Sequence, residues 1–293
     1  ALASSGYLYL STDGGTSFSK PGISSVNATT RPWLAASVSA DGQVLVAATD
    51  NLIYISADRG SSWTNNAGYG NIYNLTVSDN GQKIMLATKS GYIYYSADRG
   101  VTFTAGGSTS NHWMDVAFSN DGNTLWATSN GVYARAGTGT GLGYQGGLYK
   151  STDAGTNWNL AYADNTALNL DVSNDGKKII LSTYGVSAGK IITSIDGGQN
   201  WTINNNSYAK IRKVAISDNG KIMGAVFANG VMLSKNNGES FEMEGALPFN
   251  SIYSGFALSN NGSKAVVCEL NTPGNVYGRI NIDLGKSLDV TAN

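Results

Sequence analysis

The sequence has few charged residues, and those few nearly cancel. Lys and Arg number 19 and Asp and Glu number 20 among 293 residues, so the net charge at pH 7 is −1 and 13% of residues are charged. A protein that follows a nucleic-acid backbone needs clustered positive charge. The composition therefore argues against nucleic acid as a partner.

Cysteine, histidine and long apolar runs are also scarce. The single cysteine, Cys268, lies in an apolar run and has no second cysteine to pair with, so we expect a small core residue. One histidine and one cysteine do not supply a zinc site, so no metal and no cofactor are expected. Apolar runs stay far below the roughly 18 residues of a membrane-spanning helix. No membrane insertion is expected.

Helical periodicity is missing too, because no stretch keeps the 3.6-residue apolar spacing for three turns. What recurs instead is the pattern Ser-x-Asp-x-Gly-x-x-aromatic, found six times at intervals of 40 to 55 residues. We call it the acidic-turn motif, and Ser56-Ala-Asp58-Arg-Gly60-Ser-Ser-Trp63 is one copy. The acidic positions are Asp13, Asp58, Asp98, Asp153 and Asp196, with Asn236 in the sixth copy.

Each residue type in the acidic-turn motif has a structural reason. The Asp side chain can accept hydrogen bonds from backbone N–H groups of its own turn. The Gly permits a left-handed backbone conformation, and the aromatic ring can pack between neighbouring sheets. We therefore expect all six acidic positions to be structural rather than catalytic.

A second motif alternates with the first, also six times. An apolar run ends in Ser, an Asp-Gly or Asn-Gly turn follows, and a further apolar run such as residues 44–48 begins. These dipeptides tolerate the positive φ angles of tight hairpins. The turns are at Asp41-Gly42, Asn80-Gly81, Asp121-Gly122, Asp175-Gly176, Asn219-Gly220 and Asn261-Gly262.

Each repeat unit therefore reads as four antiparallel strands. A four-stranded sheet with two apolar faces must stack on other sheets, and radial stacking gives a β-propeller. We predict an all-β fold, a single β-propeller domain over residues 1–293 with blades of four antiparallel strands. Six blades are favoured and seven are the alternative. The N-terminal segment (6–20) and the C-terminal segment (253–270) are expected to close one blade together, although residues 275–284 form another strand-like run.

The six copies of the acidic-turn motif resemble the repeat of the Asp-box (BNR) family, and the resemblance spans about residues 5 to 270. That family includes sialidases, xyloglucan-type glycoside hydrolases, sortilin-like receptors, photosystem assembly factors and propeller lectins. The resemblance implies the propeller fold. It leaves the activity open, because one fold carries many functions.

Topology indicates where a site should lie. Within a blade, the connection between the first two strands and that between the last two share one end, which holds both repeated turns. The other connections share the opposite end, which we call the loop face, and function is more often carried by such variable loops. The longest insertion, residues 130–147, belongs to the loop face, and we interpret it as a flap over the channel mouth.

The loop face gathers aromatic rings and planar polar groups, which are the chemistry that holds sugars. For Trp33 and Trp113, core packing is the competing interpretation. Corresponding positions differ between repeats, which favours one central site or a protein-binding surface over six equal sites. The residues expected to bind a ligand are Arg31, Trp33, Tyr73, Asn111, His112, Trp113, Tyr133, Arg135, Tyr144, Tyr184, Arg212 and Tyr253.

Catalysis is the alternative. A glycoside hydrolase needs two carboxylates that face each other across a cleft. The candidates are Asp50, Asp115, Asp164 and Asp171, and for Asp115 a hydrogen-bonded structural role competes. The resemblance also implies a sialidase as a possibility, and a sialidase needs three arginines that bind a carboxylate. The sequence around Arg31 is Arg-Pro-Trp, which differs from the Arg-Ile-Pro motif of the sialidases.

Our leading hypothesis is a non-enzymatic binding module that recognises a carbohydrate or a cell-surface glycoconjugate at the loop face. Low charge with abundant Gly, Ser, Asn, Thr and Tyr is typical of secreted carbohydrate-handling β-proteins, so we expect a secreted, extracellular or periplasmic location. The alternatives are a glycoside hydrolase and a protein-interaction or assembly scaffold with a protein partner.

Overall fold

The computed structural model describes residues 6–13, 17–21, 30–89, 91–107, 110–131, 145–184, 189–208, 210–227, 230–243, 253–269, 276–281 and 289–290. These residues form two compact units. The first unit contains the described residues between 2 and 10 and between 19 and 168. The second contains those between 11 and 18 and from 169 onward.

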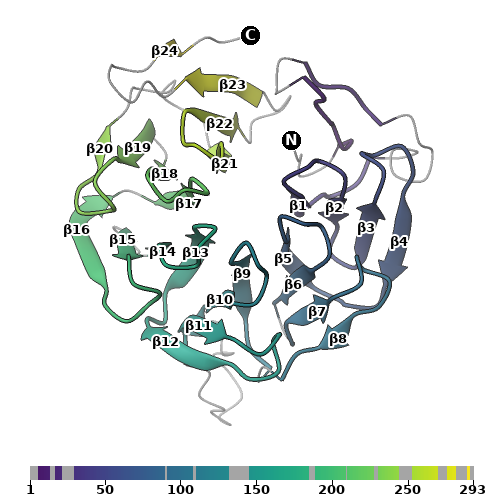
Figure 1. The fold of residues 1–293 in the computed structure, drawn as a ribbon, viewed down its shortest axis with the longest axis horizontal. Coiled ribbons are helices and arrows are strands. Elements are labelled where there is room, and N and C mark those ends of the chain that lie inside the picture. Colours follow the sequence, from purple (N-terminus) through teal and green to yellow (C-terminus); the bar gives the residue numbers. More distant parts are fainter. Residues whose placement is uncertain are drawn as a thin grey trace. The chain divides into compact units, whose positions relative to one another are not determined.

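The described residues form six antiparallel sheets of four strands each, in chain order (Figure 1). The first sheet holds β1 (Ala35–Val38), β2 (Leu45–Ala48), β3 (Leu52–Ser56) and β4 (Thr64–Ala67). The second holds β5 (Ile72–Val77), β6 (Ile84–Thr88), β7 (Tyr94–Ser96) and β8 (Thr104–Ala105). The third holds β9 (Trp113–Phe118), β10 (Leu125–Ser129), β11 (Gly147–Ser151) and β12 (Asn159–Ala163).

The remaining three sheets repeat this order. The fourth holds β13 (Ala167–Val172), β14 (Ile179–Thr183), β15 (Gly189–Ser194) and β16 (Thr202–Tyr208). The fifth holds β17 (Ile211–Ile216), β18 (Met223–Phe227), β19 (Gly230–Ser234) and β20 (Glu242–Met243). The sixth holds β21 (Tyr253–Leu258), β22 (Lys264–Glu269), β23 (Val276–Asn281) and β24 (Asp289–Val290). The boundary between the two units falls within β13.

The all-β prediction is confirmed, since the described residues contain no α-helix. Nothing in the described part of the chain is a helix long and apolar enough to cross a membrane.

The Asx-Gly turns form as the sequence predicts. In the first sheet, Ser39 Oγ donates to Asp41 Oδ1 at 2.6 Å, and Asp41 Oδ1 also accepts from the Gln43 N–H at 3.0 Å. The hydroxyl oxygen of Ser39 accepts from the Val44 N–H at 2.9 Å, so the serine ties both sides of the turn together. Gly42 closes the turn with a φ of 70°, a conformation that residues with a side chain avoid.

The acidic-turn motifs are equally regular. In the copy at Asp98, the carboxylate accepts from Ser96 Oγ at 2.7 Å, from the Thr102 N–H at 2.9 Å and from Thr102 Oγ1 at 2.6 Å. These bonds connect the end of β7 to the start of β8. The hydroxyl and backbone donors around it hold the pKa of Asp98 at about 2. The same network recurs at Asp13, Asp58, Asp153, Asp196 and Asn236.

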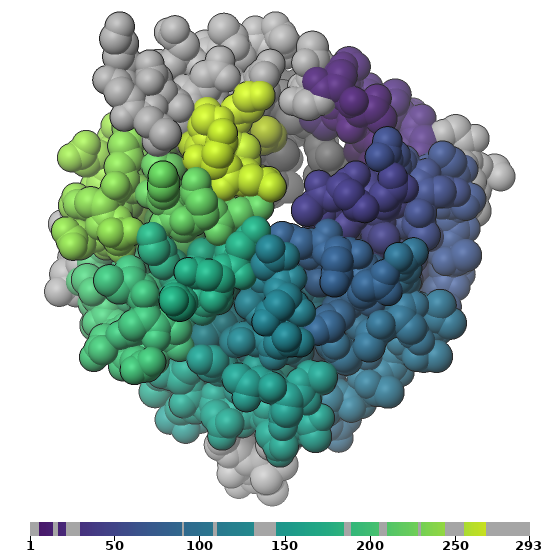
Figure 2. All heavy atoms as spheres, viewed as in Figure 1, coloured from purple at the N-terminus to yellow at the C-terminus, as the bar shows by residue number. Residues whose placement is uncertain are grey.

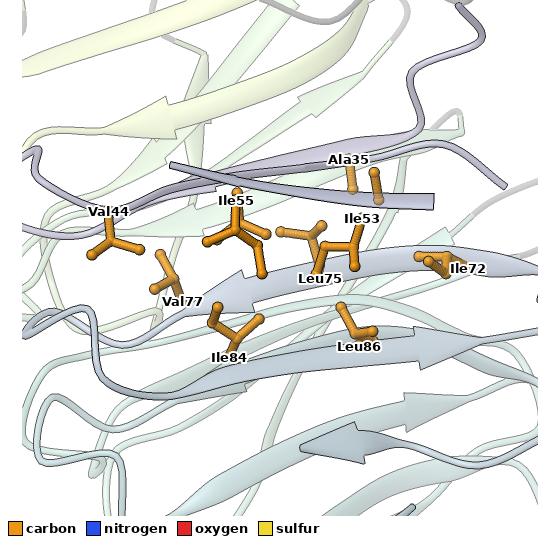
Figure 3. Close-up of a cluster of buried hydrophobic side chains, with 11 residues drawn as sticks. Ala35, Val44, Ile53, Ile55, Ile72, Leu75, Val77, Ile84 and Leu86 are labelled. Carbon is orange, nitrogen blue, oxygen red and sulfur yellow. The ribbon is translucent and has the colours of Figure 1, made fainter. Parts of the chain in front are cut away.

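Neighbouring sheets pack face to face through branched aliphatic side chains. In the first unit, Ile53 and Ile55 of β3 lie against Leu75, Val77 and other residues of the second sheet (Figure 3). All of these side chains are buried. In the space-filling view the first two sheets, coloured dark to mid blue, lie against each other (Figure 2). Such a core is an interface between sheets rather than the interior of one sheet.

A further contact between sheets repeats at the Asx-Gly turns. A methyl group added to Gly81 would lie 2.5 Å from Cγ2 of Val44, which belongs to the preceding sheet. Val44 is the fifth residue after the turn serine of its own sheet. The same relation links Lys83 with Gly122, Lys178 with Gly220, and Ile222 with Gly262. Each of these four turn glycines therefore leaves room for one side chain from the sheet before it.

The first strand of each sheet is an edge strand whose outer N–H groups need acceptors. Within the first unit, β1, β5 and β9 lie side by side (Figure 1). Ser37 Oγ on β1 accepts from the Val77 N–H on β5 at 3.2 Å. Side chains of one sheet thus satisfy the backbone of the next.

The prediction that the two chain ends share one blade was wrong. The sixth sheet takes its third and fourth strands, β23 and β24, from the C-terminal segment. The N-terminal segment instead forms isolated bridges, Leu10 with Ser19 and Gly6 with Arg31. Since consecutive strands pair more readily than strands from opposite chain ends, β23 occupies the place expected for residues 7–10.

Candidate functional site

Polar and aromatic side chains gather at the loop face of the second and third sheets. Tyr73, near the start of β5, is 37% exposed. Lys89 follows β6 directly, and its Nζ lies 4.8 Å from the centroid of the Tyr73 ring. Asn111 and His112 precede β9, and two backbone hydrogen bonds join Asn111 to Gly91 in the loop after β6. We call Tyr73, Lys89, Asn111 and His112 the Tyr73 cluster.

His112 is held as a neutral ring. Burial first, and then the positive charge of Lys89, lower the pKa of His112 below its usual value. Its Nδ1 lies 3.1 Å from Sδ of Met114, and its backbone N–H donates to Asn111 Oδ1 at 2.8 Å. At neutral pH the cluster therefore presents one cation, one neutral imidazole and one phenol ring.

Both tryptophans of the expected site are buried. Trp33 packs edge-on against Tyr54, with ring centroids 5.2 Å apart, and the Arg31 guanidinium lies 5.3 Å from the Tyr54 ring. Trp113 meets Tyr149 at 5.2 Å, also edge-on. These contacts favour the core-packing interpretation of both indoles, and a direct role in binding stays a prediction.

Two of the candidate carboxylates accept hydrogen bonds from backbone N–H groups of edge strands. Asp115 is buried on β9, where Oδ1 accepts from the Val116 N–H at 3.0 Å and from the side-chain amide of Asn74. Asp171 on β13 accepts from the Val172 N–H and, through Oδ2, from the Ile216 N–H, both at 2.9 Å. Both carboxylates thus act as backbone acceptors, as Ser37 does. This is the structural role that competes with catalysis.

The other two candidate carboxylates lie in loops. Asp164 Oδ1 accepts from the N–H of Thr166 at 2.8 Å and from its hydroxyl at 2.6 Å, which shapes the turn into β13. Asp50 is exposed after β2, and its carbonyl oxygen accepts from the Ile72 N–H at 2.8 Å. Catalysis by any of the four stays a prediction.

The remaining expected residues divide into two groups. Tyr184 and Arg212 are exposed in the second unit, and the Arg212 carbonyl accepts from Asn169 Nδ2 at 3.2 Å. Tyr133, Arg135 and Tyr144 lie outside the described residues, as does the side chain of Tyr253.

Two residues of this surface were not among the expected ligand-binding residues. Lys89 approaches Tyr73 although 16 positions separate them in the chain, and Tyr92 is exposed beside Gly91. The sequence signal that could have identified these two residues is their place in the loop after β6, which lies at the same end of the sheet as Tyr73. Among described residues, His, Cys, Asp and Glu do not form a group of three that could hold a metal ion.

No family model matches this sequence, and no curated sequence is similar to it. The structure is similar to hydrazine synthase of Kuenenia stuttgartiensis, with a TM-score of 0.67, 14% identity, and coverage of 97% of this chain and 94% of that chain. It is similar to YCF48 bound to D1 peptide, with a TM-score of 0.65, 14% identity, and coverage of 92% and 85%. It is also similar to an ancestral GH74 enzyme, with a TM-score of 0.65, 16% identity, and coverage of 96% and 39%.

The fold is a β-propeller. Six four-stranded antiparallel sheets and the similarity to solved propellers agree on this, and the predicted fold class is confirmed. At identities of 11–16% these likenesses extend to the fold alone. Propellers of this kind include both binding proteins and enzymes, so the function must be argued from the side chains.

Proposed function

We propose that this chain is a non-enzymatic binding module that recognises a carbohydrate or cell-surface glycoconjugate through the Tyr73 cluster. The observation that carries the proposal is an exposed phenol ring with an ammonium group 4.8 Å from its centroid. An aromatic face packs against the C–H surface of a sugar, and nearby donors satisfy its hydroxyls. Neutral His112 can serve as a donor or an acceptor beside them.

The hydrogen bonds of two candidate carboxylates support a binding function over glycoside hydrolysis. A hydrolase needs one carboxyl group with a raised pKa and a second one across a cleft. Asp115 and Asp171 instead accept hydrogen bonds from backbone N–H groups of the sheets, which is a structural role. We also propose that the protein works outside the cytoplasm, in keeping with its low charge, and fractionation of source cells tests this.

A glycan array with the full chain tests the proposed function. Each glycan that binds is then assayed with a Tyr73→Ala variant and with Tyr9→Ala as control, because Tyr9 is similarly exposed at 36% and lies outside the cluster. Loss of an aromatic contact worth about 1 kcal/mol weakens binding about fivefold. Equal affinities for both variants would remove Tyr73 from the site.

The same experiment also distinguishes the binding module from a glycoside hydrolase and from a protein-interaction scaffold. Mass spectrometry of each bound glycan after incubation detects cleavage, and cleavage would replace the binding proposal with the hydrolase. If no glycan binds, the proposal fails and a protein partner becomes the better hypothesis. A solved propeller of similar fold with a bound peptide makes that outcome physically reasonable.

A further inference from the structure

His112 is the only histidine in the sequence, and its surroundings decide which ring nitrogen carries the proton. A neutral imidazole donates from one nitrogen and accepts at the other, so its tautomer determines which group a ligand must offer. Lys89, His112 and Met114 all belong to the first compact unit, so the contacts among them do not involve the second unit.

The contact between His112 and Met114 distinguishes the two tautomers. Nδ1 of His112 lies 3.1 Å from Sδ of Met114. A thioether sulfur has lone pairs and no hydrogen, so it can only accept a hydrogen bond. If Nδ1 also presented a lone pair, two electron-rich atoms would repel each other at this distance. A proton on Nδ1 turns the same contact into an N–H···S hydrogen bond, so the geometry favours the ring that is protonated at Nδ1.

The backbone and the burial of Met114 hold this contact in place. The His112 N–H donates to Asn111 Oδ1 at 2.8 Å, and the His112 carbonyl oxygen accepts from the Asn130 N–H at 3.1 Å. Met114 lies on β9 and is 5% exposed, so its sulfur cannot turn away into solvent. The ring orientation is therefore fixed from both sides.

The remaining nitrogen, Nε2, is left as an acceptor. Burial and the charge of Lys89 lower the pKa of His112, so at neutral pH only one ring nitrogen carries a proton. With that proton on Nδ1, Nε2 keeps its lone pair. Any group that meets Nε2 must then donate a hydrogen bond, and a carboxylate or an ether oxygen, which only accepts, is disfavoured there.

Lys89 has the opposite requirement. Its ammonium group offers three donors and no acceptor, and its Nζ lies 4.8 Å from the centroid of the exposed Tyr73 ring. A hydroxyl group can accept from Lys89 and donate to His112 Nε2 at the same time, whereas a carboxylate satisfies Lys89 alone. The pair therefore selects hydroxyl groups over anionic groups.

We propose that His112 is a specificity-determining residue of the Tyr73 cluster, with Nδ1–H donating to Met114 and Nε2 accepting a hydrogen bond from a hydroxyl of a neutral sugar. Met114 is a positioning residue, because it acts on the sugar only through the ring. The ligand class is a neutral glycan rather than an acidic one that contains uronate. The choice of ligand rests on the proposed function, and the tautomer does not.

Nitrogen NMR of the isotope-labelled full chain tests the tautomer. Because the chain has one histidine, the spectrum contains one imidazole, and the chemical shift separates a nitrogen with a proton from a nitrogen with a lone pair. We expect a protonated Nδ1 and an unprotonated Nε2. Met114→Leu keeps a similar volume and removes the acceptor, so it should shift the tautomer ratio toward Nε2–H by about fivefold. Met232→Leu is the matched control, because Met232 is similarly buried, at 4%, in the fifth sheet.

The same spectra recorded with added sugars test the ligand. The probes are the neutral methyl glycosides of glucose, galactose and mannose, with sodium glucuronate as the acidic comparison, each at millimolar concentration. We expect a neutral glycoside to move the Nε2 resonance of His112 and glucuronate to leave it in place. Glycans that bind on the array are added in the same way.

Three results would overturn the inference. The first is an unmodified chain whose ring is protonated at Nε2, and the second is an equal tautomer ratio in Met114→Leu and Met232→Leu. The third is a glycan that binds on the array without moving the Nε2 resonance, or a stronger response to glucuronate than to the neutral glycosides. Failure of the proposed function looks different: no glycan binds, which removes the hydroxyl partner, while the tautomer is still decided by the spectrum of the chain alone.

Discussion

Gly42 and Gly81 provide a matched pair for measuring what contact between sheets contributes. They occupy the same turn position, with φ of 70° and 69°. They differ in their neighbours, because a Cβ atom at Gly81 would lie 2.5 Å from Cγ2 of Val44, whereas a Cβ atom at Gly42 would meet nothing within 4 Å. Alanine at either position therefore shares the backbone cost, and only Gly81→Ala adds a collision.

The two costs can be estimated separately. A left-handed alanine costs about 1–2 kcal/mol, and the lower entropy of the unfolded alanine chain offsets part of this. We therefore expect Gly42→Ala to lower the free energy of unfolding by about 1 kcal/mol. Val44 is buried and β-branched, so displacing it adds a further ~1–3 kcal/mol at Gly81.

Equilibrium urea unfolding of the two variants measures the difference. Val44→Ala, alone and combined with Gly81→Ala, completes a double-mutant cycle, and we expect a favourable coupling of about 1–3 kcal/mol. Equal destabilisation by Gly42→Ala and Gly81→Ala, with no coupling to Val44, would refute the argument that the preceding sheet holds the turn.

Two further predictions concern the core and the acidic turns. Trp113→Ala should lower the free energy of unfolding by about 3–5 kcal/mol, because the indole is buried against Tyr149; an unchanged urea midpoint would show that it is not a core residue. The pKa values of Asp58 and Asp98 lie at about 2, so their stabilising contribution is present above about pH 4 and is lost as the pH falls toward 2. In thermal unfolding measured against pH, the midpoint should therefore be level above about pH 5 and fall below about pH 4. The Asp98→Asn variant should show a smaller fall. A midpoint that stays constant down to pH 2 would contradict these pKa values.

Local features of the fold could be predicted because their causes are local. Ser39, Asp41 and Gly42 form their turn through contacts within five residues, as the Ser-Asx-Gly spacing indicates. Asp98 likewise meets its donors within four residues. Such motifs identify hairpins wherever they occur, and an Asx-Gly turn followed by an acidic turn marks each of the first five sheets.

Features that depend on the neighbouring sheet were harder to predict. Alternation along a strand shows which side chains share a face, but both faces of a stacked sheet are covered. The sequence therefore could not distinguish a buried Trp113 from a ligand contact. Lys89 and Tyr73 meet across different strands, and no spacing in the chain indicates that their side chains touch.

The sequence alone determined the repeat, the turns and the stacked four-stranded sheets, because each follows from hydrogen bonds and apolar patterning over a few residues. Only the tertiary structure decided that β23 completes the sixth sheet and that Asp115 and Asp171 accept backbone hydrogen bonds. The physical reason is that pairing and burial are settled by which sheet lies next to which. That choice depends on residues distant in the chain.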